Sequence, residues 1–257
     1  MKLHQILMTL VVAIPASAQW LHHMPPGTPL LPDGKANLSA AVPRTPDGKP
    51  VLTGVWMPPT SYVGNIAKDL KPGEVSFTPW GAKMYKHRVD TEGTDDPQAY
   101  CVLSGVPRED VVPYPFKVLQ MRNEIAILYE AILSYRQIFM DGRSLPKDPN
   151  PTWMGYSVGH WDGDTLVVDT TGFNDEGWID NSGHPNTDAL HVTERFHRVD
   201  FGHMDLSITI DDPKAYTKPW TVPLHLTLQP DGELLEYVCS ENEKDLHHLV
   251  GKQVEGK

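Results

Sequence analysis

A series of short apolar segments separated by turn residues limits the folds open to this chain more than any other feature. The first pair, FKVLQ and EIAILYE, is joined by the turn-like MRN and predicts a hairpin. The series continues with YRQIFMDG, MGYSVGHW, DTLVVDTTGF, LHVTERFHRVD, MDLSITIDD, WTVPLHLTL and ELLEYVC. Turn signals separate several of them, namely Asp162-Gly163-Asp164, Phe201-Gly202-His203 and Pro230-Asp231-Gly232. Short strands at regular spacing predict an antiparallel barrel or sandwich and exclude a doubly wound parallel sheet.

One helix and one earlier strand complete the expected fold. In TPWGAKMYKHRVD, Thr78 is expected to cap a short helix whose first residue is Pro79. The strand VLTGVWMPP contains Gly54-x-Trp56, which resembles the entry to a lipocalin or calycin barrel. That resemblance favours a mainly β, lipocalin-like antiparallel barrel, with a β-sandwich as the alternative.

The N-terminal residues have the pattern of a secretory signal peptide. Lys2 precedes an apolar run from Ile6 to Ile14, and small residues follow at Ala16 and Ala18. The run is about half of the roughly 20 residues that a membrane-spanning helix needs. We therefore expect cleavage after Ala18 and a secreted or periplasmic protein. The expected organisation is a signal peptide over residues 1–18, a Pro/Gly-rich extended arm over 19–50 and one β-rich domain over 51–257.

The net charge and the two cysteines indicate which partners and which redox compartment to expect. The formal net charge is -11, so we expect no nucleic-acid partner and no binding to anionic membranes. The two cysteines, Cys101 and Cys239, would meet an oxidising compartment after export. We expect them to form a disulfide; the alternative is two separate buried thiols.

A central motif carries a second resemblance. The stretch PTWMGYSVGHWDGDTLVVDTTGFND, with DALHVTERF and DDPKAYTKPW downstream, resembles an uncharacterised family of secreted bacterial proteins. The resemblance covers about half of the mature chain. It implies secretion and a β-rich fold, and it assigns no activity to any residue.

Titratable residues are densest in the same region, and Glu194 is the first catalytic candidate. Alternation along LHVTERFHRV places Glu194 among apolar residues on one face of a strand, with His191 and Arg195 on the other. Burial raises the pKa of a carboxyl group unless an Arg partner restores its charged form. Glu194 or His191 could transfer a proton while Arg195 holds an anionic oxygen. The alternative is that Glu194 belongs to a structural ion pair.

A divalent metal is the weaker hypothesis for the histidines. His191 could bind a metal with His184 and Asp188 from the preceding loop. His197 is six residues from His191, about 20 Å along an extended strand, which is too far for both to bind one ion. No compact ligand motif is present, so no cofactor is predicted, and the alternative is that these histidines are surface residues.

Aromatic residues suggest a ligand pocket. Tyr and Trp pair a large apolar area with a polar tip, which suits a pocket wall. The candidates are Trp56, Trp153, Trp161, Tyr216 and Trp220, and the alternative is that they fill the core. Because nucleophile and dinucleotide motifs are missing, we expect a barrel that binds a small, partly apolar or aromatic molecule. The alternatives are a cofactor-independent lyase, isomerase or hydrolase, and an envelope protein whose arm, Gln19 to Pro50, docks onto a partner.

Overall fold

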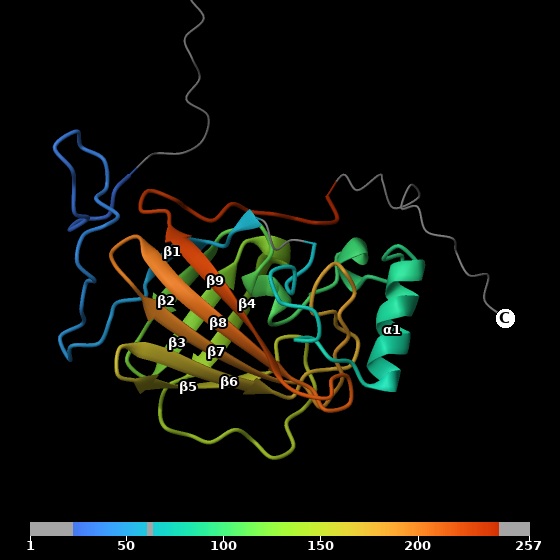
Figure 1. Ribbon diagram of the computed structural model, residues 1–257. Helices are drawn as coiled ribbons and strands as arrows, with labels where there is room; N and C mark the ends of the chain where they lie inside the picture. Colours follow the sequence, from blue (N-terminus) through green and yellow to red (C-terminus); the bar gives the residue numbers. More distant parts are fainter. Residues whose placement is uncertain (1–22, 61–63, 242–257) are drawn as a thin grey trace, which may run out of the picture.

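The computed structural model describes residues 23–60 and 64–241, in which nine strands close into a barrel (Figure 1). The strands are β1 (Gly54–Met57), β2 (Phe116–Gln120), β3 (Glu124–Tyr129), β4 (Ser134–Phe139), β5 (Tyr156–Asp162), β6 (Thr165–Thr171), β7 (His191–Arg198), β8 (His203–Asp211) and β9 (Trp220–Leu228). The mainly β barrel is confirmed, and the sandwich alternative is wrong. The expected signal peptide lies outside the described residues.

Each strand pairs with its neighbour in the chain, and β9 returns to β1. All these pairs are antiparallel except β4 and β5, which are parallel, so the expectation of a purely antiparallel sheet is wrong at this position. A parallel pair needs a crossover connection rather than a tight turn. Residues 140–155 provide that crossover. The two strands share only two residue pairs, Ile138 with Ser157 and Phe139 with Val158.

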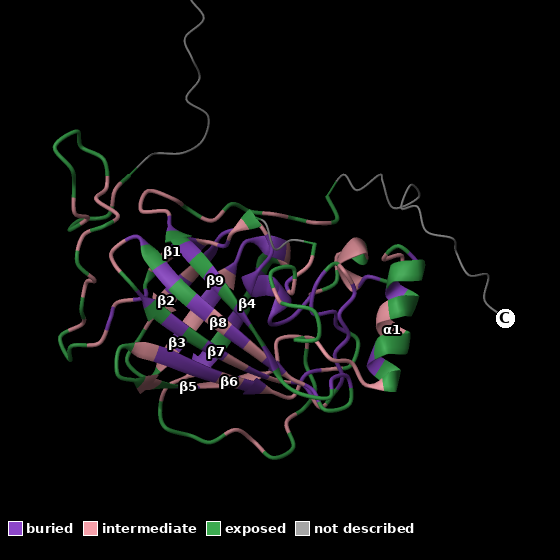
Figure 2. Cartoon of the chain, in the orientation of Figure 1, coloured by how far each residue is buried: buried purple, intermediate pink, exposed green. Residues whose placement is uncertain are grey.

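Burial alternates along the strands, as Figure 2 shows for the wall formed by β7, β8 and β9. In β9 every second residue from Trp220 to Leu228 is buried and the residues between are exposed. Successive side chains of a strand point to opposite faces, so one set fills the barrel and the other faces outward. The interior is filled by a continuous apolar cluster that includes Trp56, Phe116, Ile138, Phe196 and Leu206.

The expected last strand, ELLEYVC, is not a strand. β9 already pairs with β8 on one side and with β1 on the other, so the closed barrel leaves no edge for another strand. The segment instead lies along the barrel end. The Leu235 amide donates to Glu130 Oε2 at 2.8 Å, and the Tyr237 ring lies 5.3 Å from that of Tyr114.

The helix α1 (Pro79–Asp90) begins as the sequence predicts. Thr78 Oγ1 accepts from the Gly81 amide at 3.0 Å, and Pro79 is the first helical residue. A Cβ at Gly81 would lie 2.1 Å from the Ala215 carbonyl oxygen, so only glycine permits this contact between the helix and the β8–β9 connection. Three short 3-10 helices follow, η2 (Pro97–Tyr100), η3 (Arg108–Asp110) and η4 (Ala131–Leu133). No helix within residues 23–60 and 64–241 has the length and apolar character to cross a membrane.

The Pro-rich arm packs against its own barrel. The Phe201 amide, at the turn between β7 and β8, donates to the Ala40 carbonyl at 2.8 Å. Further along, Arg44 makes two hydrogen bonds to the Asp164 carboxylate at the β5–β6 turn. The arm therefore contacts the barrel at the β7–β8 and β5–β6 turns.

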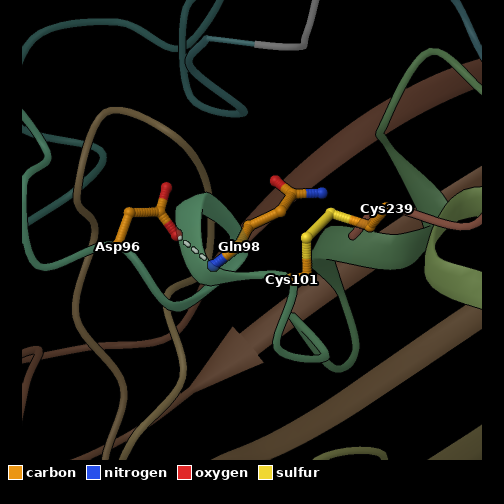
Figure 3. The surroundings of a disulfide bond; sticks show 4 residues. All are labelled: Asp96, Gln98, Cys101 and Cys239. Carbon is orange, nitrogen blue, oxygen red and sulfur yellow. Dashed lines mark hydrogen bonds between the residues drawn. A yellow bond between two sulfur atoms is a disulfide. The ribbon is translucent and has the colours of Figure 1, made fainter. Parts of the chain in front are cut away.

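The disulfide between Cys101 and Cys239 is confirmed (Figure 3). The two Cα atoms are 5.5 Å apart and the residues are separated by 138 positions. Cys101 follows η2, whose first turn is capped by Asp96 accepting from the Gln98 amide at 3.0 Å. The bond attaches the segment after β9 to the loop that precedes η3.

Replacing Cys101 and Cys239 together by Ser should destabilise the protein by about 3–5 kcal/mol, because the unfolded chain regains the freedom of a very long closed loop. Urea unfolding monitored by circular dichroism measures the change. The wild-type protein under reducing conditions is the matched control and should lose the same amount. An unfolding midpoint unchanged in the variant would show that the bond contributes no stability.

Candidate functional site

A group of polar side chains is enclosed at one end of the barrel. Arg136 on β4 and Glu194 on β7 form a buried ion pair, with Arg136 Nη1 donating to Glu194 Oε1 at 3.0 Å and Nη2 donating to Oε2. The same guanidinium donates to Ser157 Oγ at 2.9 Å and to Thr170 Oγ1 at 2.7 Å. A buried ion pair is stable only when hydrogen bonds satisfy its remaining groups. The two hydroxyls meet that need here.

A second carboxyl group enters the cluster from outside the sheet. Asp110, the last residue of η3, is fully buried, and its Oδ2 lies 3.9 Å from Arg136 Nη1. Tyr129 on β3 donates its hydroxyl to Asp110 Oδ1 at 2.8 Å. Burial raises the pKa of Asp110 well above its usual range, and the charge of Glu194 raises it further against the opposing effect of Arg136. On balance these effects disfavour the charged form of Asp110.

The charges of Arg136 and Glu194 compensate each other. Burial lowers the pKa of Arg136, but the charge of Glu194, its hydrogen bond and the neighbouring Tyr129 and Asp110 together outweigh burial and hold that pKa above its usual value. Burial also raises the pKa of the Tyr129 hydroxyl, so it stays protonated. Arg136 and Glu194 thus form a charge-compensated pair. A molecule that reaches Arg136 therefore meets a cation that is already paired with a carboxylate.

A pocket of about 620 Å³ leads to this cluster at the junction of β4 and β5. The junction is open there because the two strands pair only from Ile138 and Ser157 onward. Arg136 and Ser157 lie at its inner end, and the other lining residues are Leu103, Ile132, Leu133, Ser134, Tyr135, Gln137, Phe139, Thr152, Met154, Gly155 and Tyr156. We call this the β4–β5 pocket. Its volume lies within the range of about 300–1,000 Å³ typical of small-molecule sites.

Local backbone geometry shapes the rim of the β4–β5 pocket. Ile132 and Leu133 have φ values of 54° and 46°, in the left-handed region that non-glycine residues rarely adopt. Such strained residues gather at functional sites. Opposite them, Gly155 has a φ of 68°, and a Cβ there would lie 2.7 Å from Thr170 Cγ2. Glycine lets the start of β5 approach β6 while the pocket stays open on its other side.

The three predicted catalytic residues do not converge on one cavity. Glu194 faces the barrel interior, as the alternation predicts. His191 and Arg195 face outward, where His191 Nε2 lies 2.9 Å from Asp169 Oδ1 and Arg195 donates to Asp162 at 2.8 Å. The enzymatic alternative stays a prediction, with Glu194 alone of the three in the buried cluster.

The predicted ligand-binding aromatics are dispersed, and none of the five lines the β4–β5 pocket. Trp56 is buried at the opposite end of the barrel, where Arg198 lies over its ring at 5.0 Å. Trp161, at the outer end of β5, lies under the Lys49 ammonium at 5.8 Å. Trp153 lies between two pocket residues, Thr152 and Met154.

Trp220 instead lies beside His184, and Tyr216 lies beside Trp220. The Tyr216 and Trp220 rings are 5.4 Å apart, and Trp220 lies 5.5 Å from the His184 ring. His184 is itself buried, with Nδ1 2.7 Å from Asp180 Oδ2. This group packs the loop after β6 against the barrel.

The three candidate metal ligands do not form a site together. His184 is held by Asp180, Asp188 pairs with Lys214, and His191 lies against Asp169. Among the residues that the structure describes, no group of three His, Cys, Asp or Glu side chains could hold a metal ion.

Sequence reasoning missed Arg136 and the buried charges of η3. Arg108, Glu109 and Asp110 are consecutive, and all three are buried at the barrel end. Arg108 pairs with Asp96 at 2.6 Å, and Glu109 Oε1 accepts from the Ser104 amide at 3.3 Å. A short charged run normally indicates a solvated loop. One pattern could have identified Arg136. Alternation along SYRQIF places Arg136 on the same face of the strand as Ser134 and Ile138, which is the buried face.

Comparison with known proteins adds no family. The chain matches no protein-family model, and none of the curated proteins searched matches it. The resemblance to an uncharacterised secreted family therefore stays a prediction.

Removing one member of the buried pair should cost far more than removing both. Glu194→Met or Arg136→Met alone leaves a buried unpaired charge, and each should lower the free energy of unfolding by about 3–5 kcal/mol. The double variant should lose less than either single variant. Urea unfolding measures all three. Arg195→Met, which breaks an exposed pair on the same strand, is the control and should cost at most about 1 kcal/mol. Additive losses in the double variant would contradict the coupling.

Glu109 should make stability depend on pH. Burial raises its pKa from 4.5 to about 7, because the charged form is desolvated. The folded state then binds a proton that the unfolded state releases, so this stabilisation is complete below pH 4.5 and is lost as the pH rises to about 7. Relative to wild type, Glu109→Gln should gain on the order of 3 kcal/mol across that window. Unfolding curves at several pH values test this, and a pH-independent difference would contradict it.

Proposed function

We propose that this protein binds a small, uncharged, partly aromatic molecule in the β4–β5 pocket. The observation that carries the proposal is the pocket of about 620 Å³ that reaches Arg136 and Ser157 through the junction of the two strands. The barrel interior is filled with apolar side chains, so the wall of the barrel rather than its centre is the proposed location.

The lining of the pocket supports this class of ligand. Phe139 and Tyr156 lie side by side across the junction with their rings 5.2 Å apart, and Arg143 lies over the Phe139 ring at 3.9 Å while donating to the Tyr156 hydroxyl at 2.9 Å. Tyr135 adds a further, exposed ring. Flat aromatic surfaces favour stacking of an aromatic ligand.

The polar end of the pocket supports an uncharged ligand. Arg136 is neutralised by Glu194, so a bound anion would face no unpaired cation. Hydroxyl and amide groups of Ser134, Ser157 and Gln137 can hydrogen-bond a hydroxyl or carbonyl group. Ligand sites commonly combine an apolar wall with a few such polar groups.

The proposal includes export to a secreted or periplasmic location. The pattern of residues 1–18 supports it, and the Cys101–Cys239 disulfide is compatible with an oxidising compartment. Binding would then take place outside the cytoplasm. The envelope-interaction alternative stays a prediction.

Titration of the protein with N-phenyl-1-naphthylamine, an uncharged aromatic fluorophore, tests the proposal. We expect saturable binding with a stoichiometry of one. Tyr135→Ala should weaken it about tenfold, the equivalent of one aromatic contact. Gln137→Trp, which places an indole in the pocket, should abolish it.

Trp80→Ala is the matched control, because Trp80 is an exposed aromatic residue on α1, outside the pocket. It should leave the affinity unchanged. Absent binding, or binding equally strong in the Gln137→Trp variant, would overturn the proposal. Native mass spectrometry of the purified protein would identify any molecule that it retains.

A further inference from the structure

A second pocket lies at the other end of the barrel, between the Pro-rich arm and the junction of β1 with β9. Its volume is about 410 Å³. The lining residues are Pro25, Pro26, Gly27, Thr28, Pro43, Val51, Thr53, Gly54, Val55, Lys117, Arg198, Phe201, Leu228, Gln229, Pro230 and Gly232. We call it the arm pocket. None of its lining residues belongs to the β4–β5 pocket, so the two can be tested separately.

Arg198 is the first feature that points to a ligand. It is buried, with only 3% of its surface exposed, and its guanidinium donates to three backbone carbonyls, those of Val51, Asp200 and Phe201. Within residues 23–60 and 64–241 it forms no ion pair with a carboxylate. Carbonyl oxygens satisfy its hydrogen bonds but leave its charge uncompensated, and a buried charge is costly unless it is paired.

The nearest carboxylate does not supply the missing pair. Asp200 acts on Arg198 through its charge, but its Oδ1 accepts from the Gly202 amide at 2.9 Å and lies 2.7 Å from His203 Nδ1. Burial lowers the pKa of Arg198 to about 10, so the guanidinium remains charged at neutral pH. The pocket therefore retains a cation.

Lys117 adds a second cation. It lies on β2 directly opposite Val55 of β1, and both line the pocket. In the part of the chain that the structure describes, the Lys117 side chain has no hydrogen bond or ion pair, while its backbone pairs with β1 and β3. The lining contains two cations and no acidic residue, although the whole chain has a net charge of -11. Local positive charge on an acidic protein favours an anion at this place.

Most of the remaining lining is apolar. The prolines of the arm contribute to it, together with Val55, Phe201 and Leu228. An inorganic anion would leave this surface unused, whereas a molecule with an apolar body would cover it. Charge and shape together indicate an amphipathic anion.

We propose that the arm pocket binds a free carboxylate that carries an apolar chain or ring, with the carboxylate facing Lys117 and Arg198 and the apolar body lying along the prolines of the arm. This site is additional to the β4–β5 pocket and takes the opposite chemistry, an anion rather than an uncharged molecule. Arg198 also donates to the carbonyl of Val51, the first residue after the arm, so an occupant would contact a residue that holds the end of the arm against the barrel.

Isothermal titration with decanoate and with 1-decanol tests the proposal, because the two probes share a chain and differ in head-group charge. Decanoate should bind the wild-type protein at least about tenfold more tightly than decanol, as expected for an ionic contact near the protein surface. Lys117→Glu should remove that preference. The Lys117 side chain makes no hydrogen bond or ion pair with a described residue, so the variant should fold.

Lys218→Glu is the matched control, since it makes the same charge change at an exposed residue before β9, at the other end of that strand from Leu228. It should retain the preference for decanoate. Gln137→Trp should also retain it, which separates this site from the β4–β5 pocket. Equal binding of the two probes, or equal effects of Lys117→Glu and Lys218→Glu, would overturn the proposal.

Discussion

The buried pair of Arg136 and Glu194 is the interaction on which the open end of the barrel depends. An ion pair removed from water must recover its lost hydration through its surroundings. Arg136 does so by binding β5 through Ser157 and β6 through Thr170 as well as β7 through Glu194. Between β4 and β5 the backbone ladder has only two residue pairs, so a side chain supplies part of the connection that main-chain hydrogen bonds supply elsewhere.

The two shortest junctions of the barrel coincide with the two pockets that we assign. β1 and β9 pair through two positions, Trp56 with Leu228 and Met57 with Thr227, and the arm pocket lies beside them. The β4–β5 junction is equally short and opens into the other pocket. At each junction an arginine crosses from the barrel interior to the pocket. The charge of Arg136 is compensated by Glu194, whereas Arg198 has no carboxylate partner among the described residues. We therefore propose an uncharged ligand for the β4–β5 pocket and an anion for the arm pocket.

Features governed by local sequence were predictable, and those governed by distant contacts were not. The strand alternation that turns Glu194 inward and the cap formed by Thr78 depend on residues a few positions apart, and both are confirmed. The segment ELLEYVC has the composition of a strand, but whether it pairs depends on a free sheet edge, which the closing of β1 onto β9 removes. Arg136 is 58 positions from Glu194, and no local pattern links them.

The disulfide determines what a single cleavage of the backbone would do to the barrel. Cys101 precedes β2 and Cys239 follows β9, so eight of the nine strands lie inside one covalent ring. The crossover of residues 140–155 is among the exposed parts of that ring, and exposed loops are preferred sites of proteolytic cleavage. A single cut there would leave both fragments joined through sulfur, with each strand still held beside its neighbours.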